Sequence, residues 1–121
     1  MGTFSWPIRI SDLAGRRSRD LEAIVDTGAA YTTLPACLLH ELGVAPLGAR
    51  RFLIADGRRI TMEWGEARAT IDGESVTTLV VFGDDAASAL LGAYTLEGLG
   101  LAVDPVEQRL VSTTLILCLA S

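Results

Sequence analysis

The first ten residues alternate between apolar and other positions. The apolar side chains occupy every second place: Phe4, Trp6, Ile8 and Ile10. Side chains of a strand point alternately to its two faces, so a period of two predicts a half-buried strand. The polar segment 11–20 then predicts a hairpin loop, and the apolar segment 21–25 predicts a second strand.

Two short helices are expected in a chain that is otherwise rich in strand patterns. Residues 33–42 carry leucines on one helical face, with Pro35 near the first turn and Gly43 at the place of a C-terminal cap. Residues 94–99 form the second expected helix, which Gly100 closes.

The middle of the chain predicts a hairpin. Segments 51–55 and 59–64 flank Asp56-Gly57, a dipeptide suited to a tight turn. The parity of the apolar positions changes at Gly65, which predicts a bulge or a bend there. Residues 76–82 are apolar on both parities, as in a central strand.

The last third of the chain adds shorter elements. Residues 84–88 predict a loop, and 89–91 a short strand that ends at Gly92. A final hairpin is expected from residues 101–103 and 109–111. Together these patterns predict an all-β fold with one or two short helices.

The composition fits one domain that spans residues 1–121. Half of the residues are hydrophobic, so the chain can bury a core. The formal charge of −5 argues against a nucleic-acid partner, because binding to phosphates needs a basic surface. All ten basic residues are arginines, and the absence of lysine excludes Schiff-base catalysis and a lysine-centred phosphate loop.

We expect neither a metal nor a cofactor. One histidine, His40, and two distant cysteines, Cys37 and Cys118, are too few for a zinc site built from His and Cys. Both cysteines are expected to be buried free thiols, and His40 a surface residue. Asp84-Asp85 is interpreted as a solvated loop, since no further ligands are spaced nearby.

No targeting or membrane segment is recognised. The first seven residues lack the basic and apolar regions of a signal peptide. The longest late apolar run, residues 115–120, is far shorter than the roughly 20 residues of a membrane helix. We therefore expect a cytoplasmic protein without a membrane partner.

One stretch carries most of the candidate chemistry. The apolar run 23–25 leads directly into Asp26-Thr27-Gly28-Ala29. The strand thus delivers a carboxylate to a sharp turn, where the Thr27 hydroxyl can bond backbone groups. Gly28 allows backbone angles that a Cβ would penalise, and it lets another backbone segment approach closely. The small side chain of Ala29 keeps the chain narrow where it leaves the loop. Asp26 is the candidate catalytic residue, and the next three residues would support its loop.

This loop resembles the active-site loop of retropepsin-like aspartic proteases (clan AA). Farther along, Leu90-Leu91-Gly92 is similar to the apolar-apolar-Gly motif of the same family. The order of the elements also matches theirs, and residues 90–111 resemble small single-domain prokaryotic members. The resemblance covers roughly residues 3–111, and it implies a closed, barrel-like sheet with a flap hairpin.

The resemblance implies a homodimeric endopeptidase. Each chain carries one Asp26, and two copies would meet across a two-fold axis. Adjacent carboxylates cannot both ionise cheaply, so the pair shares a proton. The ionised carboxylate would activate a water, and the protonated one would donate to the scissile carbonyl. By similarity, Thr27 of each chain would brace the opposite loop.

The hairpin tip would be the flap. By similarity, Ala55-Asp56-Gly57-Arg58 closes over an extended peptide or protein substrate. The neighbouring pair Arg58-Arg59 is most simply solvated, and the alternative is that it selects acidic substrate side chains. The flap is not glycine-rich, which favours a lower mobility.

Some positions depart from the viral pattern. Ala30 and Tyr31 stand where viral enzymes usually have acidic residues, and Ala93 stands where they usually have an arginine. Their joint replacement is self-consistent, because one charge kept alone would be unpaired. One interpretation of the apolar run 115–120 is an intermolecular strand of the dimer.

Two further hypotheses remain open. The first is a non-catalytic module that binds a peptide in the same groove, or a dimerisation domain. The intact motif at Asp26 argues against it, since a pure binder needs no pair of carboxylates. The second is a metal-dependent hydrolase, which lacks ligand clusters in this sequence. Trp6 and Trp64 are expected to be core or interface anchors.

Overall fold

The computed structural model describes residues 3–119 and consists mainly of strands. The strands are β1 (Ser5–Ser11), β2 (Ser18–Val25), β3 (Thr32–Pro35), β4 (Gly48–Leu53), β5 (Arg59–Ile71), β6 (Glu74–Gly83), β7 (Leu90–Leu91), β8 (Leu101–Asp104) and β9 (Arg109–Ser112). The helices are α1 (Ala36–Glu41) and α2 (Ala93–Gly98). The predicted all-β class with two short helices is confirmed.

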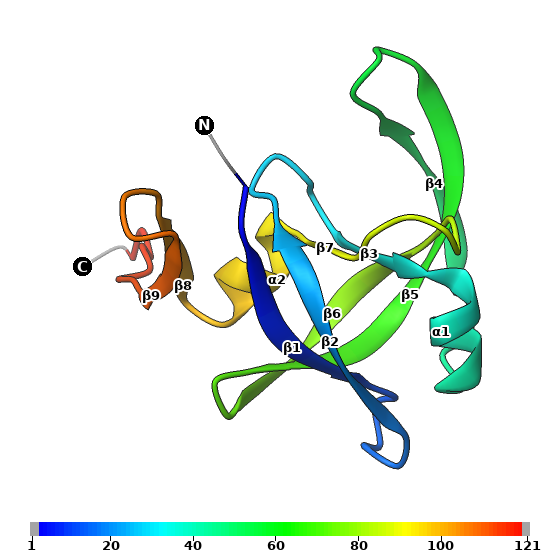
Figure 1. The fold of residues 1–121 in the computed structure, drawn as a ribbon, viewed down its shortest axis with the longest axis horizontal. Helices are drawn as coiled ribbons and strands as arrows, with labels where there is room; N and C mark the ends of the chain where they lie inside the picture. Colours follow the sequence, from blue (N-terminus) through cyan, green and yellow to red (C-terminus); the bar gives the residue numbers. More distant parts are fainter. Residues whose placement is uncertain (1–2, 120–121) are drawn as a thin grey trace.

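Seven of the strands form one mixed sheet that closes on itself. Their order is β1-β2-β7-β3-β6-β5-β4, and β1 also pairs with β5. Six strands therefore make a ring, from which the β4–β5 hairpin projects (Figure 1). Closure through the short β1–β5 pairing, from Arg9 opposite Thr70 to Ser11 opposite Arg68, shortens the exposed strand edges, which can otherwise recruit other chains. The predicted barrel-like sheet is confirmed.

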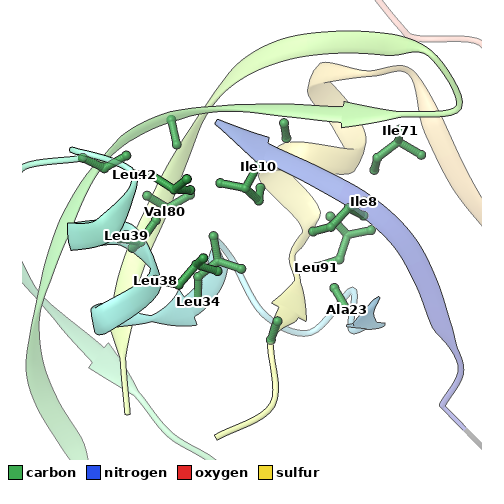
Figure 2. Close-up of a cluster of buried hydrophobic side chains, with 14 of the residues drawn as sticks. Ile8, Ile10, Ala23, Leu34, Leu38, Leu39, Leu42, Ile71, Val80 and Leu91 are labelled. Carbon is green, nitrogen blue, oxygen red and sulfur yellow. The ribbon is translucent and has the colours of Figure 1, made fainter. Parts of the chain in front are cut away.

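The core lies inside this ring and beneath α1. Ile10, Leu39 and Leu91 are fully buried, and they come from a strand, a helix and the short β7. Figure 2 shows the α1 leucines pointing towards the same interior as the isoleucines of β1. Each large apolar side chain buried in this way contributes about 1.5–3 kcal/mol to folding. The core therefore joins strands from both halves of the chain.

The final hairpin is also where the sequence predicts it. β8 pairs with β9 in a separate two-stranded sheet next to α2 (Figure 1). Residues 113–119 follow without helix or strand, and they expose apolar side chains: Leu115, Ile116, Leu117 and Leu119. Ala120, the last residue of the apolar run, lies outside the described residues. Within residues 3–119, no helix is long and apolar enough to cross a membrane.

The first helix begins later than the sequence predicts. Residues 32–35 form β3, which runs parallel to β6 with Thr32 opposite Val80. Pairing with a central strand overrides the local helix signal, so the helix begins only at Ala36. Its predicted end is confirmed: Gly43 has φ +80°, and its N–H donates to the carbonyl of His40 at 3.0 Å.

No bulge occurs at Gly65. β5 pairs with β6 from Trp64 opposite Val81 to Ile71 opposite Glu74 without an inserted residue. Figure 1 shows this long strand curving from the projecting hairpin into the barrel. The parity of the apolar residues changes because the strand buries one face before Gly65 and the opposite face after it. From Gly65 onward its odd positions face the core, whereas the even positions 60–64 are half-buried on the other face.

Gly65 is also a point of close packing on this curved strand. A Cβ built on it would lie 2.8 Å from the backbone oxygen of Ala45 and 3.2 Å from the Phe82 ring. The segment after α1 crosses the sheet at this point and leaves no room for a side chain. A glycine is therefore required by close packing.

We predict that Gly65→Ala destabilises the fold by about 1–3 kcal/mol, the usual range for overpacking a dense site. Chemical denaturation of the purified variant measures this change. Glu66→Ala is the matched control, because Glu66 is the exposed neighbour on the same strand. The control should stay within about 0.5 kcal/mol of the parent. Equal stabilities of the two variants would contradict the packing argument.

Candidate functional site

Asp26 follows the last residue of β2 and begins an exposed loop. Its backbone N–H donates to the carbonyl of Leu91 at 3.0 Å. Its carboxylate accepts a hydrogen bond from the Gly28 N–H at 3.0 Å, and its carbonyl accepts one from the Ala29 N–H at 3.1 Å. The half-buried carboxylate is thus oriented by the backbone of its own loop. Thr27 and Gly28 are exposed beside it.

The second predicted motif lies directly against this loop. β7, made of Leu90 and Leu91, inserts between β2 and β3, the two strands that flank the loop. The Ala93 N–H then donates to the Ala29 carbonyl at 2.8 Å, and the Tyr94 N–H donates to the Ala30 carbonyl at 3.0 Å. The two motifs, distant in sequence, therefore form one backbone unit.

Gly92 is where this unit is tightest. A Cβ on Gly92 would lie 2.5 Å from the carbonyl carbon and oxygen of Tyr31, and 2.9 Å from the oxygen of Ala29. These are backbone atoms, which cannot rotate away. The glycine of the apolar-apolar-Gly motif is thus required so that the loop can pass over the end of β7.

Three buried threonine hydroxyls form a hydrogen-bonded chain that supports the backbone unit made by the two motifs. The Gly92 N–H donates to Thr32 Oγ1 at 3.1 Å; Thr32 Oγ1 lies 2.6 Å from Thr95 Oγ1, which lies 2.7 Å from Thr78 Oγ1. All three threonines are at most 1% exposed. The chain links β3, α2 and β6, and buried hydroxyls need such partners.

The sequence reasoning did not identify these threonines as site residues. The available signal was the dipeptide Tyr-Thr, which occurs both after the Asp26 loop, as Tyr31-Thr32, and after Gly92, as Tyr94-Thr95. Thr78, in contrast, lies in an apolar strand whose pattern gives no indication of a polar partner.

The predicted hairpin tip is present between β4 and β5. The Ile54 N–H donates to the Arg58 carbonyl at 2.9 Å, and Gly57 has φ +90°. The Asp56 carboxylate accepts bonds from the Arg58 backbone N–H at 2.9 Å and from its Nε at 2.6 Å. Ala55 is exposed at the same tip. The tip is therefore braced by its own side chains. Figure 1 shows it projecting from the same end of the barrel as the loop between β2 and β3.

An aromatic cluster connects the hairpin to the loop. The Tyr31 ring packs edge-on against Phe52 of β4, at 5.7 Å between centroids, and against Tyr94 of α2, at 5.8 Å. Arg50 Nη1 donates to the Tyr31 hydroxyl at 3.0 Å, and the guanidinium lies 4.0 Å from the centre of the Trp64 ring. The sequence reasoning noted Tyr31 only as a departure from the viral pattern and missed this contact.

The remaining polar candidates lie elsewhere. Cys37 and Cys118 are free but exposed, so their predicted burial is wrong. The hydrogen bond with Asp85 is the largest cause that raises the pKa of the Cys37 thiol, which disfavours a reactive thiolate. His40 is exposed, as predicted. Among residues 3–119, no three His, Cys, Asp or Glu side chains are grouped as a metal site requires.

Comparison with known proteins gives matches to solved structures only. No family model matches the chain, and no curated protein matches it. The EIAV protease in complex with the inhibitor HBY-793 has 19% identity and a TM-score of 0.54, with 96% of this chain and 94% of that one covered.

Two further structures match over most of the chain. The Simian Foamy Virus (mac) protease has 18% identity and a TM-score of 0.53, over 77% of this chain and 93% of that one. A retropepsin-like aspartic protease from Rickettsia conorii has 22% identity and a TM-score of 0.51, over 85% of each chain. The chain has the retropepsin-like fold, as the sequence resemblance implies.

We predict that Gly92→Ala destabilises the fold by about 3 kcal/mol or more, because the new methyl group meets backbone atoms that cannot yield. Thermal or chemical unfolding measures the loss. Gly98→Ala in α2 is the matched control, since its Cβ would meet only the two side-chain methyl groups of Val76, at 3.3 and 3.8 Å. It should change stability by less than about 1 kcal/mol. A Gly92→Ala variant as stable as this control would refute the close approach.

The threonine chain gives a second prediction. Thr95→Val keeps the side-chain shape but leaves the hydroxyls of Thr32 and Thr78 without their shared partner, which costs about 1–3 kcal/mol. Thr95→Ser keeps the hydroxyl and loses one methyl group, which costs about 0.8 kcal/mol. Urea unfolding of both variants compares them. A valine variant more stable than the serine variant would contradict the role of the hydroxyl.

Proposed function

We propose that two copies of this chain form an aspartic endopeptidase. The observation that carries the proposal is the Asp26 carboxylate, held in an exposed loop by the Gly28 N–H and seated on the β7 motif. The chain shares its fold with proteins described as proteases, among them an aspartic one. Fold alone does not fix function, so the proposal depends on this loop.

The dimer follows from the chemistry. Hydrolysis by an acid–base pair of carboxylates needs two such groups side by side, and each chain offers one Asp26 at its exposed loop. In a two-fold dimer the same patch of both chains meets itself, so the two Asp26 loops would come together. Thr27, exposed at the same loop, would brace the partner loop.

Each carboxylate would have a separate task during the reaction. Two adjacent carboxyl groups share one proton, because a second negative charge at that distance is costly. The ionised carboxylate takes a proton from a water molecule, which attacks the carbonyl carbon of the peptide. The protonated carboxyl donates to the carbonyl oxygen, which gives a tetrahedral diol. The carboxyl that took the water's proton then donates it to the amide nitrogen as the C–N bond breaks, and the other carboxylate takes a proton from a hydroxyl of the diol. No covalent bond to the enzyme is formed.

The projecting hairpin would cover the substrate. Its tip, Ala55–Arg58, and the Asp26 loop lie at one end of the barrel, so an extended peptide would pass between them (Figure 1). A strand-like peptide can bond to exposed backbone groups there, and the hairpin would exclude bulk water from the reaction. We therefore assign this hairpin as the flap.

Asp26→Asn is the direct test. We expect the variant to keep its fold and its dimer, because an amide oxygen can still accept the Gly28 hydrogen bond. Peptide cleavage should fall by at least about a hundredfold, the lower end of the acid–base contribution. Activity of the parent should be highest below neutral pH and be suppressed by a statine-type mimic. Full cleavage by Asp26→Asn would overturn the mechanism.

Mixing the parent with the same variant tests the shared site. If each dimer needs two intact Asp26 residues, an equal amount of Asp26→Asn reduces the parent's activity to about half by random pairing. Thr77→Ser, an exposed change on β6 that keeps Asp26, is the control, and an equal amount of it should add its own activity and not reduce that of the parent. Unchanged activity in the presence of excess Asp26→Asn would point to a complete site within one chain.

A further inference from the structure

The hairpin has one apolar face that carries a single charge. Residues that pair directly across two strands share a face. On the first face, which we term the inner face, the pairs are Gly48 with Trp64, Arg50 with Met62, and Phe52 with Ile60. The inner face is turned towards the Asp26 loop, because Phe52 and Arg50 both contact Tyr31. Arg50 is its one charged member.

The opposite face is polar and exposed. Its cross-strand pairs are Ala49 with Glu63, Arg51 with Thr61, and Leu53 with Arg59. Arg51 and Arg59 therefore point away from the loop. At the tip, Arg58 is already bonded to the Asp56 carboxylate at 2.6 Å. Of the four arginines in this hairpin, Arg50 is thus the one placed on the side of the candidate site and not paired with a carboxylate.

Arg50 is held in position without being neutralised. Its guanidinium lies over the Trp64 ring at 4.0 Å, and Nη1 donates to the Tyr31 hydroxyl at 3.0 Å. None of the salt bridges formed among residues 3–119 includes it. A guanidinium has five N–H donors in a planar fork, so donors remain for another acceptor. The cation–π contact with Trp64 and the bond to Tyr31 hold the guanidinium in place before any ligand arrives.

We propose that Arg50 selects substrates that carry an acidic side chain close to the scissile bond. The inference rests on the proposed function, in which a peptide lies between the inner face and the Asp26 loop. A carboxylate is the side-chain group that a fixed guanidinium recognises best, because two parallel N–H donors match its two oxygens. Arg50 is then a specificity-determining residue, and Tyr31 is the residue that positions it.

Paired peptides test this selectivity. An otherwise neutral peptide that the parent cleaves is synthesised with Glu or Gln at each position on either side of the scissile bond. We expect the parent to favour Glu at one position by about tenfold in kcat/KM, a modest value for a charged hydrogen bond near solvent. Arg50→Gln should equalise the two peptides. A third peptide with Lys at the same position should be favoured by Arg50→Glu.

The controls separate recognition from structure. Arg51→Gln removes the neighbouring charge from the outer face and should keep the preference for Glu. Tyr31→Phe keeps the ring but removes the hydroxyl that holds Arg50, so it should lower the ratio of kcat/KM between the Glu and the Gln peptide. A parent without any preference for Glu overturns the inference. The inference is also overturned if Arg50→Gln reduces the cleavage of both peptides equally, or if Arg51→Gln removes the preference for Glu.

Failure of the proposed function is distinguishable from failure of this inference. If the parent cleaves no neutral peptide, the proposed function is overturned. Neutral peptides that carry a single Glu or a single Gln are then compared by their binding to the parent, measured by fluorescence anisotropy. Tighter binding of a Glu peptide that is lost in Arg50→Gln supports the inference, and equal or absent binding of the two overturns it.

Discussion

The architecture of the site depends on one close approach, the passage of the loop after Asp26 over Gly92. β7 enters between β2 and β3, and the chain must continue beneath the loop that joins those two strands. A space of 2.5 Å between a would-be Cβ and the Tyr31 backbone leaves no alternative to glycine. Hydrogen bonds from the Asp26, Ala93 and Tyr94 N–H groups then lock the two segments together. The Asp26 carboxylate is oriented because the backbone beneath it cannot shift.

The rest of the barrel holds Gly92 and the loop after Asp26 in their relative positions. The threonine chain carries the Gly92 N–H bond through Thr32 and Thr95 to Thr78 on the central strand β6. β6 in turn is bonded to β5, and β5 closes the ring through β1. A shift of β7 would therefore break buried polar bonds as well as apolar contacts, and each buried hydroxyl left unpaired costs about 1–3 kcal/mol. The closed sheet and the buried hydrogen bonds inside it therefore both hold β7 in place.

The sequence was sufficient to predict the strands and turns that depend only on residues close together in the chain. Alternation located β1, a run that is apolar on both parities located β6, and the dipeptide Asp56-Gly57 located a turn that the structure contains, with φ of +90° at Gly57. The prediction failed where contact with a residue distant in the sequence determines the local structure. Residues 32–35 became a strand because β6 lies beside them, and Gly65 is required by the backbone at Ala45. The threonine chain and the contact between Arg50 and Tyr31 likewise join residues whose proximity exists only in the folded chain.

The residues that follow the two motifs carry no charge. Ala30 and Tyr31 follow Ala29, and Ala93 follows Gly92. Tyr31 supports the loop through edge-on packing against Phe52 and Tyr94. Packing of this kind does not titrate with carboxyl groups and is little affected by salt, unlike an ion pair near the surface. The Arg50 guanidinium beside Tyr31 takes part in none of the salt bridges among residues 3–119. Tyr31 therefore supports the loop by uncharged packing and also holds an available positive charge next to it.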